Sequence, residues 1–135
     1  MAKTLTISFT ARGYELDSFD HVNNAVYLSY FEHARWEYLK EMGLYELIRE
    51  KGYKLVVTDM HIRYQREIRI FNELEVESSC SIEDPYLVFR QRIVNLTTKL
   101  PAARATTKVI CLGQDKMARD IPEEIIQVLK ESVHE

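Results

Sequence analysis

The sequence predicts an α+β protein in which a five-stranded antiparallel sheet wraps around one long central helix. Two observations within the 135 residues support this class. Apolar residues recur at spacings of three and four over residues 25–42, which is typical of a helix. From Val56 to Cys111 polar and apolar residues mostly alternate, which is typical of strands. A run of strands beside a lone long helix favours an antiparallel sheet.

The N-terminal part of the chain is predicted to hold a first strand and the main helix. Residues 3–13 alternate well enough for a strand, and Gly13 marks a bulge or a close backbone approach. Gly43 interrupts the helix, a further helical piece spans residues 44–50, and Gly52 fits a left-handed cap. The apolar stripe of the main helix is rich in aromatic side chains, as a helix enclosed by a sheet requires. The stripe consists of Tyr27, Phe31, Ala34, Tyr38 and Met42.

Four more strands are predicted to follow as a meander. The third covers residues 74–82 and is broken by Asp84-Pro85, and the fourth covers residues 86–96. The fifth has small residues between Ala103 and Cys111, which would let a helix pack closely. A short C-terminal helix is expected after Asp120. The second strand is expected to have one face made of Val56, Met60, Ile62, Tyr64, Ile68 and Ile70.

Length and composition limit the classes of protein to consider. One domain over residues 1–135 is expected at this length. A net charge of −3 gives no reason to expect nucleic acid or an anionic membrane as a partner. No apolar run resembles a signal peptide or a membrane span, so a cytoplasmic location is expected. Cys80 and Cys111 are expected to be reduced and buried, and no metal-ligand spacing or cofactor motif is visible.

The segment before the main helix carries the residues best suited to chemistry. Asp17 is followed by His21, and Asn23 or Asn24 is placed to cap the helix. The first turn of a helix has unsatisfied N–H groups with a partial positive charge, which would polarise a carbonyl oxygen. A nearby carboxylate could activate water or attack the carbonyl itself. An ester or thioester is the natural target of such a site.

A structural interpretation of the same residues also stands. Aspartate, serine and asparagine before a helix are commonly turn and capping residues. Asp17 would then be a solvated turn residue, His21 a satisfied polar group, and the asparagines caps alone. The aromatic stripe would be core rather than substrate pocket.

The motif D17-SFD-HVNN-AV-Y27, followed by Y30-F-E-H-A-R35, resembles the hotdog-fold acyl thioesterases of the 4-hydroxybenzoyl-CoA thioesterase type. The resemblance covers about twenty residues closely, and the remaining elements agree in order and length. It implies hydrolysis of an acyl-CoA or acyl-carrier-protein thioester to a free acid and a thiol, without cofactor or metal. A non-catalytic acyl-thioester sensor and, less favoured, an enoyl thioester hydratase are the alternatives on this fold.

The resemblance also implies roles for individual residues. Asp17 aligns with the catalytic aspartate, as general base or nucleophile, and the backbone N–H of Asn24 aligns with the group that polarises the carbonyl. His21 aligns with a histidine of the acyl-carrier-protein thioesterases. Phe19 stands where those enzymes have an asparagine, so their Asp-Asn-His triad is not carried over intact. The substrate-binding candidates are Asn23, Tyr27, Thr58 and Asp59.

Hotdog domains resemble one another in pairing their sheets, so a homodimer or homotetramer is expected, with the acyl group between subunits. The strand around Thr58 and Asp59 would line the site of the partner. The phosphates of a CoA or carrier protein need cations, and the sequence does not choose among the candidates. These are Arg63, Arg66, Arg69, Arg90, Arg92, Arg104 and Lys108.

Overall fold

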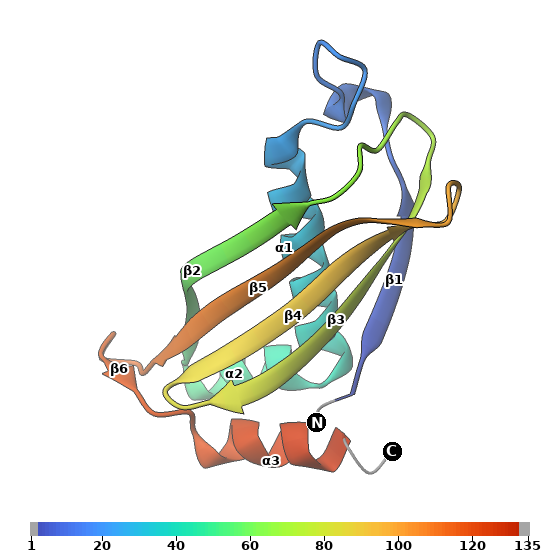
Figure 1. Cartoon of the computed structure of the whole chain (residues 1–135). Helices are drawn as coiled ribbons and strands as arrows, with labels where there is room; N and C mark the ends of the chain where they lie inside the picture. Colours follow the sequence, from blue (N-terminus) through green and yellow to red (C-terminus); the bar gives the residue numbers. More distant parts are fainter. Residues whose placement is uncertain (1–2, 133–135) are drawn as a thin grey trace.

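The computed structural model describes residues 3–132, and its centre is one antiparallel sheet with helices against it (Figure 1). The five main strands follow the spatial order β1-β3-β4-β5-β2, and a two-residue strand, β6 (Ala118–Arg119), pairs with β5. The predicted α+β class with five antiparallel strands is therefore confirmed. The main strands are β1 (Leu5–Thr10), β2 (Lys54–Tyr64), β3 (Glu73–Glu83), β4 (Tyr86–Asn95) and β5 (Leu100–Leu112).

The predicted meander is correct for β3, β4 and β5 and wrong for β2. Strand β2 pairs with β5 at one edge of the sheet, and β1 pairs with β3 at the other edge. The second strand ends at Tyr64 instead of continuing to Ile70. After it, the backbone N–H groups of Gln65 and Arg66 both donate to the Ala102 carbonyl, and the chain crosses the end of the sheet. Ile68 is buried in this connection, which is why its apolar character resembled that of a strand residue.

A β-bulge in β2 changes which side chains face the helices. The register with β5 shifts between Val57 and Asp59, so that Thr58 is the extra residue. Met60 lies opposite Thr107 on the helix side, whereas Val56 lies opposite Ile110 on the outer face. The prediction that Val56 shares a face with Met60 is therefore wrong, because the bulge reverses the alternation.

The helical layer consists of a long helix and two shorter ones. Helix α1 (Asn24–Glu41) lies along one face of the sheet, and α3 (Glu123–Ser132) lies at the far end (Figure 1). Helix α2 (Leu44–Lys51) follows α1 directly, between left-handed Gly43 and Gly52, as expected. The first strand is shorter than predicted, because Gly13 belongs to a 3₁₀ turn, η1 (Gly13–Glu15), packed closely against Ile70.

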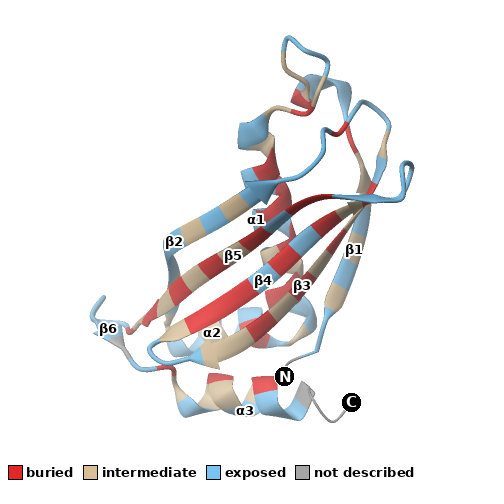
Figure 2. Ribbon diagram, viewed as in Figure 1, coloured by how far each residue is buried: buried red, intermediate tan, exposed pale blue. Residues whose placement is uncertain are grey.

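The buried face of α1 matches the predicted aromatic stripe. Tyr27, Phe31, Ala34 and Tyr38 are all buried, whereas Met42, the last member of the predicted stripe, is the C-cap of α1 and only half-buried (Figure 2). Burying one large apolar side chain contributes about 1.5–3 kcal/mol, so this stripe fixes the helix on the sheet. The small residues Ala102, Ala103 and Ala105 of β5 belong to the same core cluster.

A buried glutamine also holds α1 in place on the sheet through hydrogen bonds. The buried Gln91 side chain of β4 donates from Nε2 to the Phe31 carbonyl at 2.9 Å and to Ser78 Oγ at 3.0 Å. A buried donor that lost these partners would cost free energy, so the bond opposes sliding of α1 along the sheet.

The described residues contain neither a candidate membrane-spanning helix nor a metal-binding cluster. None of their helices combines the length and apolarity that crossing a bilayer requires. They also contain no group of three or more His, Cys, Asp or Glu side chains placed to hold a metal ion.

The buried cysteines give a test of the core. Cys80 and Cys111 are both buried, and burial raises the pKa of the Cys80 thiol to about 12. We expect an aromatic disulfide reagent at pH 8 to leave both cysteines unmodified in the folded protein and to titrate both in denaturant, since the thiolate is the reacting species. Rapid modification of either residue without denaturant would contradict this core.

Candidate active site

The start of α1 leaves one backbone N–H group available to a ligand. Asn23 is the N-cap, and its Oδ1 accepts a hydrogen bond from Ala25 N at 2.9 Å. The Asn23 carbonyl accepts from Val26 N at 2.8 Å. Within residues 3–132, no acceptor is bonded to the N–H of Asn24. This group carries the partial positive charge of the helix end and can donate to a bound oxygen.

The loop before α1 holds the carboxylate of Asp17 in place. Oδ1 accepts hydrogen bonds from the backbone N–H groups of Phe19 at 2.8 Å and His21 at 3.2 Å. The loop is closed by a 2.8 Å bond from Asp17 N to the His21 carbonyl. In the described part of the chain no donor bonds to Oδ2, so that oxygen can act on a ligand. His21 therefore orients Asp17 through its backbone N–H rather than through its imidazole.

These residues line one open hollow beside the helix start. Its volume is about 310 Å³, and Asp17, His21 and Asn24 all contribute to its wall. The three predicted catalytic residues are thus brought together. The opposite wall comes from the end of β2 and the connection after it, and consists of Tyr64, Gln65, Arg66 and Glu67.

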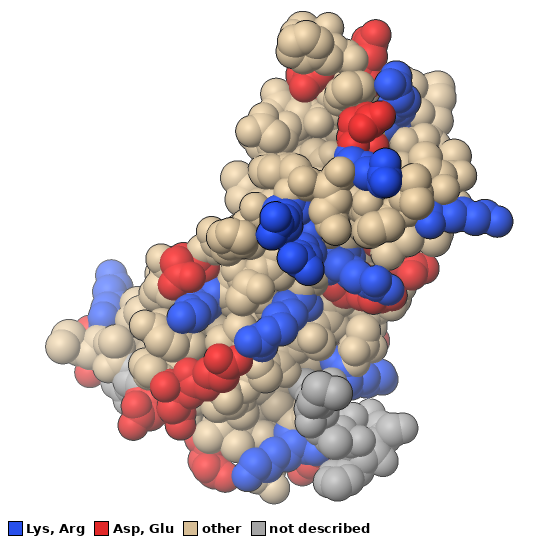
Figure 3. All heavy atoms as spheres, viewed as in Figure 1, with Lys and Arg blue, Asp and Glu red and all other residues tan. Residues whose placement is uncertain are grey.

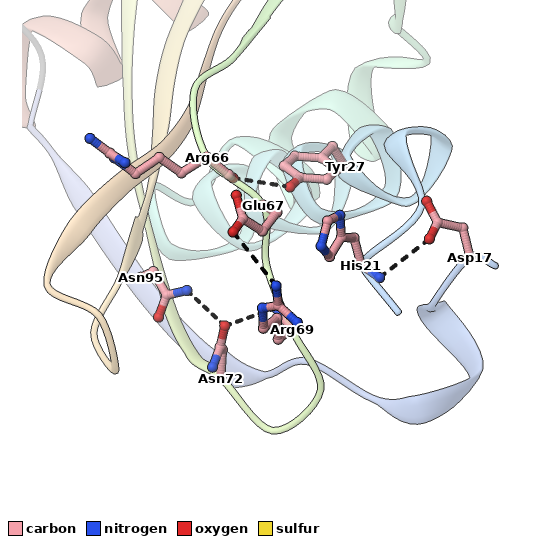
Figure 4. Close-up of polar contacts among 8 residues, drawn as sticks. All are labelled: Asp17, His21, Tyr27, Arg66, Glu67, Arg69, Asn72 and Asn95. Atoms are coloured by element: carbon pink, nitrogen blue, oxygen red, sulfur yellow. Dashed lines mark hydrogen bonds and ion pairs between the residues drawn. The ribbon is translucent and has the colours of Figure 1, made fainter. Parts of the chain in front are cut away.

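The imidazole of His21 faces a second carboxylate that sequence reasoning missed. Figure 4 shows the ring directed toward Glu67 and Tyr27, with Asp17 on its other side. A backbone hydrogen bond and the charges of His21, Arg69 and Arg66 lower the pKa of Glu67, so this carboxylate is ionised at neutral pH. Glu67 lies 46 positions after His21 in the chain, and nothing in its local pattern marks it.

Two tyrosines join the helix start to the end of β2. The rings of Tyr27 and Tyr64 meet edge to face with centroids 4.9 Å apart. Tyr64 donates from its hydroxyl to the Asn24 carbonyl at 3.0 Å, and Tyr27 donates to the Arg66 carbonyl at 3.5 Å. Burial, with smaller effects of nearby charges, raises the pKa of Tyr27 to about 12, so its hydroxyl stays neutral. Tyr27 is in the wall of the hollow, and its role in binding substrate stays a prediction.

A buried carboxylate, also missed, anchors the loop to α1. Glu15 Oε1 accepts from Tyr30 Oη at 2.7 Å and from Arg12 N at 2.8 Å, and Oε2 pairs with the Arg12 guanidinium at 3.1 Å. The Glu15 carbonyl accepts from Asn23 N at 2.9 Å, directly before the helix. No local sequence pattern marks Glu15, because Arg12, three residues before it, is not a capping residue.

Three predicted substrate-binding residues lie outside this hollow. The side chain of Asn23 is engaged in the helix cap. Thr58 and Asp59 lie at the bulge of β2, where Thr58 Oγ1 donates to the Lys108 carbonyl at 3.2 Å. The structure therefore does not bring Thr58 and Asp59 to the hollow of their own chain, and their role stays a prediction about a partner subunit.

A second hollow, of about 330 Å³, lies farther along α1 between α1, α2 and β2. Trp36 is in its wall, twelve residues after Asn24, which is about 18 Å along a helix axis. Its other apolar walls are Leu39, Ile48, Leu55, Phe89 and Val109.

The comparison with known proteins identifies the family. The model of the thioesterase-like superfamily matches residues 12–129, and the chain belongs to this family. The chain is 33% identical over 115 residues to the acyl-CoA thioesterase YbgC of Haemophilus influenzae, which covers 82% of this chain and 83% of that protein. It is 27% identical over 121 residues to the chloroplastic acyl-acyl carrier protein thioesterase ATL2 of Arabidopsis thaliana. That match covers 88% of this chain but only 64% of the plant protein.

A solved structure supports the fold. The 1,4-dihydroxy-2-naphthoyl-CoA thioesterase Slr0204 from Synechocystis superposes with a TM-score of 0.85 at 15% identity. The superposition covers 98% of this chain and 100% of that one. At this identity the likeness shows the hotdog fold alone, as the sequence predicted.

The Glu15 anchor can be tested by removing one hydroxyl. Tyr30→Phe leaves the buried Glu15 carboxylate with one donor fewer, and we expect the free energy of unfolding to fall by about 1–3 kcal/mol. Urea denaturation measures the change. Tyr45→Phe on exposed α2 is the control, with an expected change near zero. Equal stability of Tyr30→Phe and wild type would contradict the anchoring role.

Proposed function

We propose that the protein is an acyl thioesterase that hydrolyses an acyl-CoA or acyl-carrier-protein thioester to a free acid and a thiol. The observation that carries this proposal is the pairing of an unbonded Asn24 N–H with the unbonded Oδ2 of Asp17 in one hollow. Membership of the thioesterase-like superfamily and the names of the acyl-CoA and acyl-carrier-protein relatives support the reaction class.

The Asn24 N–H would act on the thioester carbonyl. A carbonyl oxygen bonded to this group is polarised, and the negative charge that develops on it is stabilised by the helix end. The Asn23 cap supports this role, because it satisfies Ala25 N and not the N–H of Asn24, a residue in the wall of the hollow.

Asp17 would supply the nucleophilic oxygen, directly or through water. As a general base its Oδ2 takes a proton from water while the water oxygen bonds to the carbonyl carbon. As a nucleophile it forms an anhydride with the acyl group, which water then cleaves. Either route breaks the carbon–sulfur bond and yields a carboxylic acid. The leaving thiolate takes up a proton that comes from the water consumed in the reaction. His21 lies between Asp17 and Glu67 and would hold the water or the thioester.

The acyl chain would extend along α1 toward the second hollow. That hollow is lined mainly by apolar side chains, and its first lining residue on α1 is Glu32, eight positions after Asn24 and about 12 Å along the helix axis. Its distance from the helix start suits an aliphatic chain of about ten carbons or more better than a short acyl group.

A second copy of the chain would cover this path. Among the strands of residues 3–132, β2 pairs with β5 alone, so its outer edge offers unpaired backbone groups. Most of β2 is exposed, whereas β4 is mostly buried (Figure 2). Val57 is 47% exposed at that edge and Leu28 of α1 is 47% exposed. Pairing of two β2 edges would cover these apolar side chains and bring Thr58 and Asp59 of each copy toward the other subunit.

The test of the catalytic proposal is a matched pair of variants in one loop. Asp17→Asn keeps an oxygen that can accept from Phe19 N and His21 N, so the loop is retained, yet hydrolysis should fall at least about 100-fold. Asp20→Asn is the control, because asparagine also tolerates the left-handed backbone at φ 62°, and it should keep full activity. Thiol release is measured over aromatic, short, medium and long acyl thioesters.

Full activity of Asp17→Asn would refute the role of Asp17. Stable binding of acyl thioesters without thiol release by the wild type would favour a sensor instead. Hydration of an enoyl thioester, seen as loss of its ultraviolet absorbance, would favour the hydratase.

The subunit pairing gives a separate prediction. Val57→Lys places a charge at the edge that would join β2 to a second copy, and natural edge strands use lysine to prevent such pairing. We expect the wild type to be a dimer or larger in light scattering and the variant to shift toward monomer with loss of activity. A monomeric, fully active wild type would contradict the shared site.

A further inference from the structure

Three arginines form a row across neighbouring strands on the outer face of the sheet. Arg63 of β2 lies opposite Arg104 of β5, and Arg104 lies opposite Arg92 of β4. Strands are about 4.8 Å apart, so the three side chains start within about 10 Å of one another. Figure 3 shows Lys and Arg gathered over this part of the face.

Without a bound anion, the row of arginines lowers the stability of the fold. Like charges directly opposite one another on adjacent strands repel and lower stability. Arg92 is neutralised by Glu77 at 2.8 Å, but in residues 3–132 no carboxylate forms an ion pair with Arg63 or Arg104. Two adjacent guanidinium groups thus lack a counterion among the described residues, and an anion from outside would relieve their repulsion.

The same face is hollowed where the row crosses it. The hollow has a volume of about 510 Å³. Its walls include Arg104, Arg92 and Arg90 together with Glu77, the partner of Arg92. Arg90 lies opposite Ser79 of β3 on one side and Thr106 of β5 on the other, and both of these residues carry hydroxyls. Guanidinium forks and hydroxyls are the groups that bind phosphate oxygens well.

The row begins next to the candidate active site. Arg63 directly precedes Tyr64, whose hydroxyl is bonded to the Asn24 carbonyl at the start of α1. Arg66, two residues later, lines the active-site hollow itself. Cations therefore continue from the catalytic hollow, over the end of β2, to the outer face of the sheet.

We propose that the row of Arg63, Arg104 and Arg92 binds the phosphate groups at the nucleotide end of a CoA thioester, which makes CoA the acyl carrier of this enzyme. The inference rests on the proposed thioesterase function and names its substrate class. The thioester lies at Asn24, the pantetheine arm passes Arg66, and the nucleotide phosphates lie on the arginines.

The observations favour a nucleotide over a carrier protein. The row is compact and two of its three guanidinium groups lack counterions, which suits a ligand with several phosphates close together. The 3′-phosphate and the diphosphate of CoA provide three such groups, whereas a carrier protein brings one phosphodiester on its arm. Glu77 and Glu83 flank the basic area and would oppose a broad acidic protein surface.

The kinetic test compares a substrate that has the phosphates with one that lacks them. Arg104→Gln should raise the KM for an acyl-CoA about tenfold and leave kcat within about twofold, since a charged hydrogen-bond partner is lost in binding only. The KM for the same acyl group on pantetheine should not change. Lys40→Gln, which removes a charge from the solvent face of α1, is the control and should behave as wild type.

A binding test does not depend on activity. Adenosine 3′,5′-bisphosphate carries two of the CoA phosphates, and calorimetry should show it binding wild type and binding Arg104→Gln about tenfold more weakly. The unfolding temperature of Arg104→Gln should equal or exceed that of wild type, because the repulsion within the row is reduced.

Equal KM changes for acyl-CoA and acyl-pantetheine, or no change for either, would overturn the proposal. A rise in KM confined to an acyl-carrier-protein substrate would overturn it in favour of protein docking. Nucleotide binding that depends on Arg104 without any thiol release would support the arginine site while refuting the hydrolase.

Discussion

The chemistry of this protein depends on how α1 is seated on the sheet. The buried aromatic stripe and the Gln91–Phe31 bond fix the helix, and that determines where the Asn24 N–H points. Tyr64 then ties the Asn24 carbonyl to the end of β2, and Glu15 ties Tyr30 to the preceding loop. A shift of the helix by one turn, about 5.4 Å, would separate the Asn24 N–H from Asp17.

In the proposed binding mode, the thioester, the acyl chain and the phosphates of the substrate lie on different surfaces of the protein. The thioester lies where the helix end, Asp17 and His21 meet, the acyl chain lies along the apolar side of α1, and the phosphates lie on the outer face of the sheet. The carboxylates of Asp17 and Glu67 lie at the catalytic hollow beside Arg66, whereas the three arginines proposed to bind phosphate lie on the outer face of the sheet. Phosphates placed beside Asp17 and Glu67 would be repelled by them.

Local patterns in the sequence predicted the elements well and their assembly less well. The 3.6-residue period specified α1, and the motif from Asp17 to Asn24 carried the catalytic candidates, because all lie within one short segment. The position of β2 beside β5 and the bulge at Thr58 follow from long-range pairing, which alternation alone does not encode. Glu67 and Tyr64 were missed for the same reason, since they reach the site from a distant strand end.

A crystal structure with a non-hydrolysable acyl-CoA analogue, in which methylene replaces the thioester sulfur, tests the central claim most directly. The account predicts the analogue carbonyl oxygen about 2.7–3.1 Å from Asn24 N, with the Asp17 carboxylate beside the carbonyl carbon or a water next to it. An analogue bound with its carbonyl remote from the start of α1, or with Asp17 turned away from it, would contradict the account.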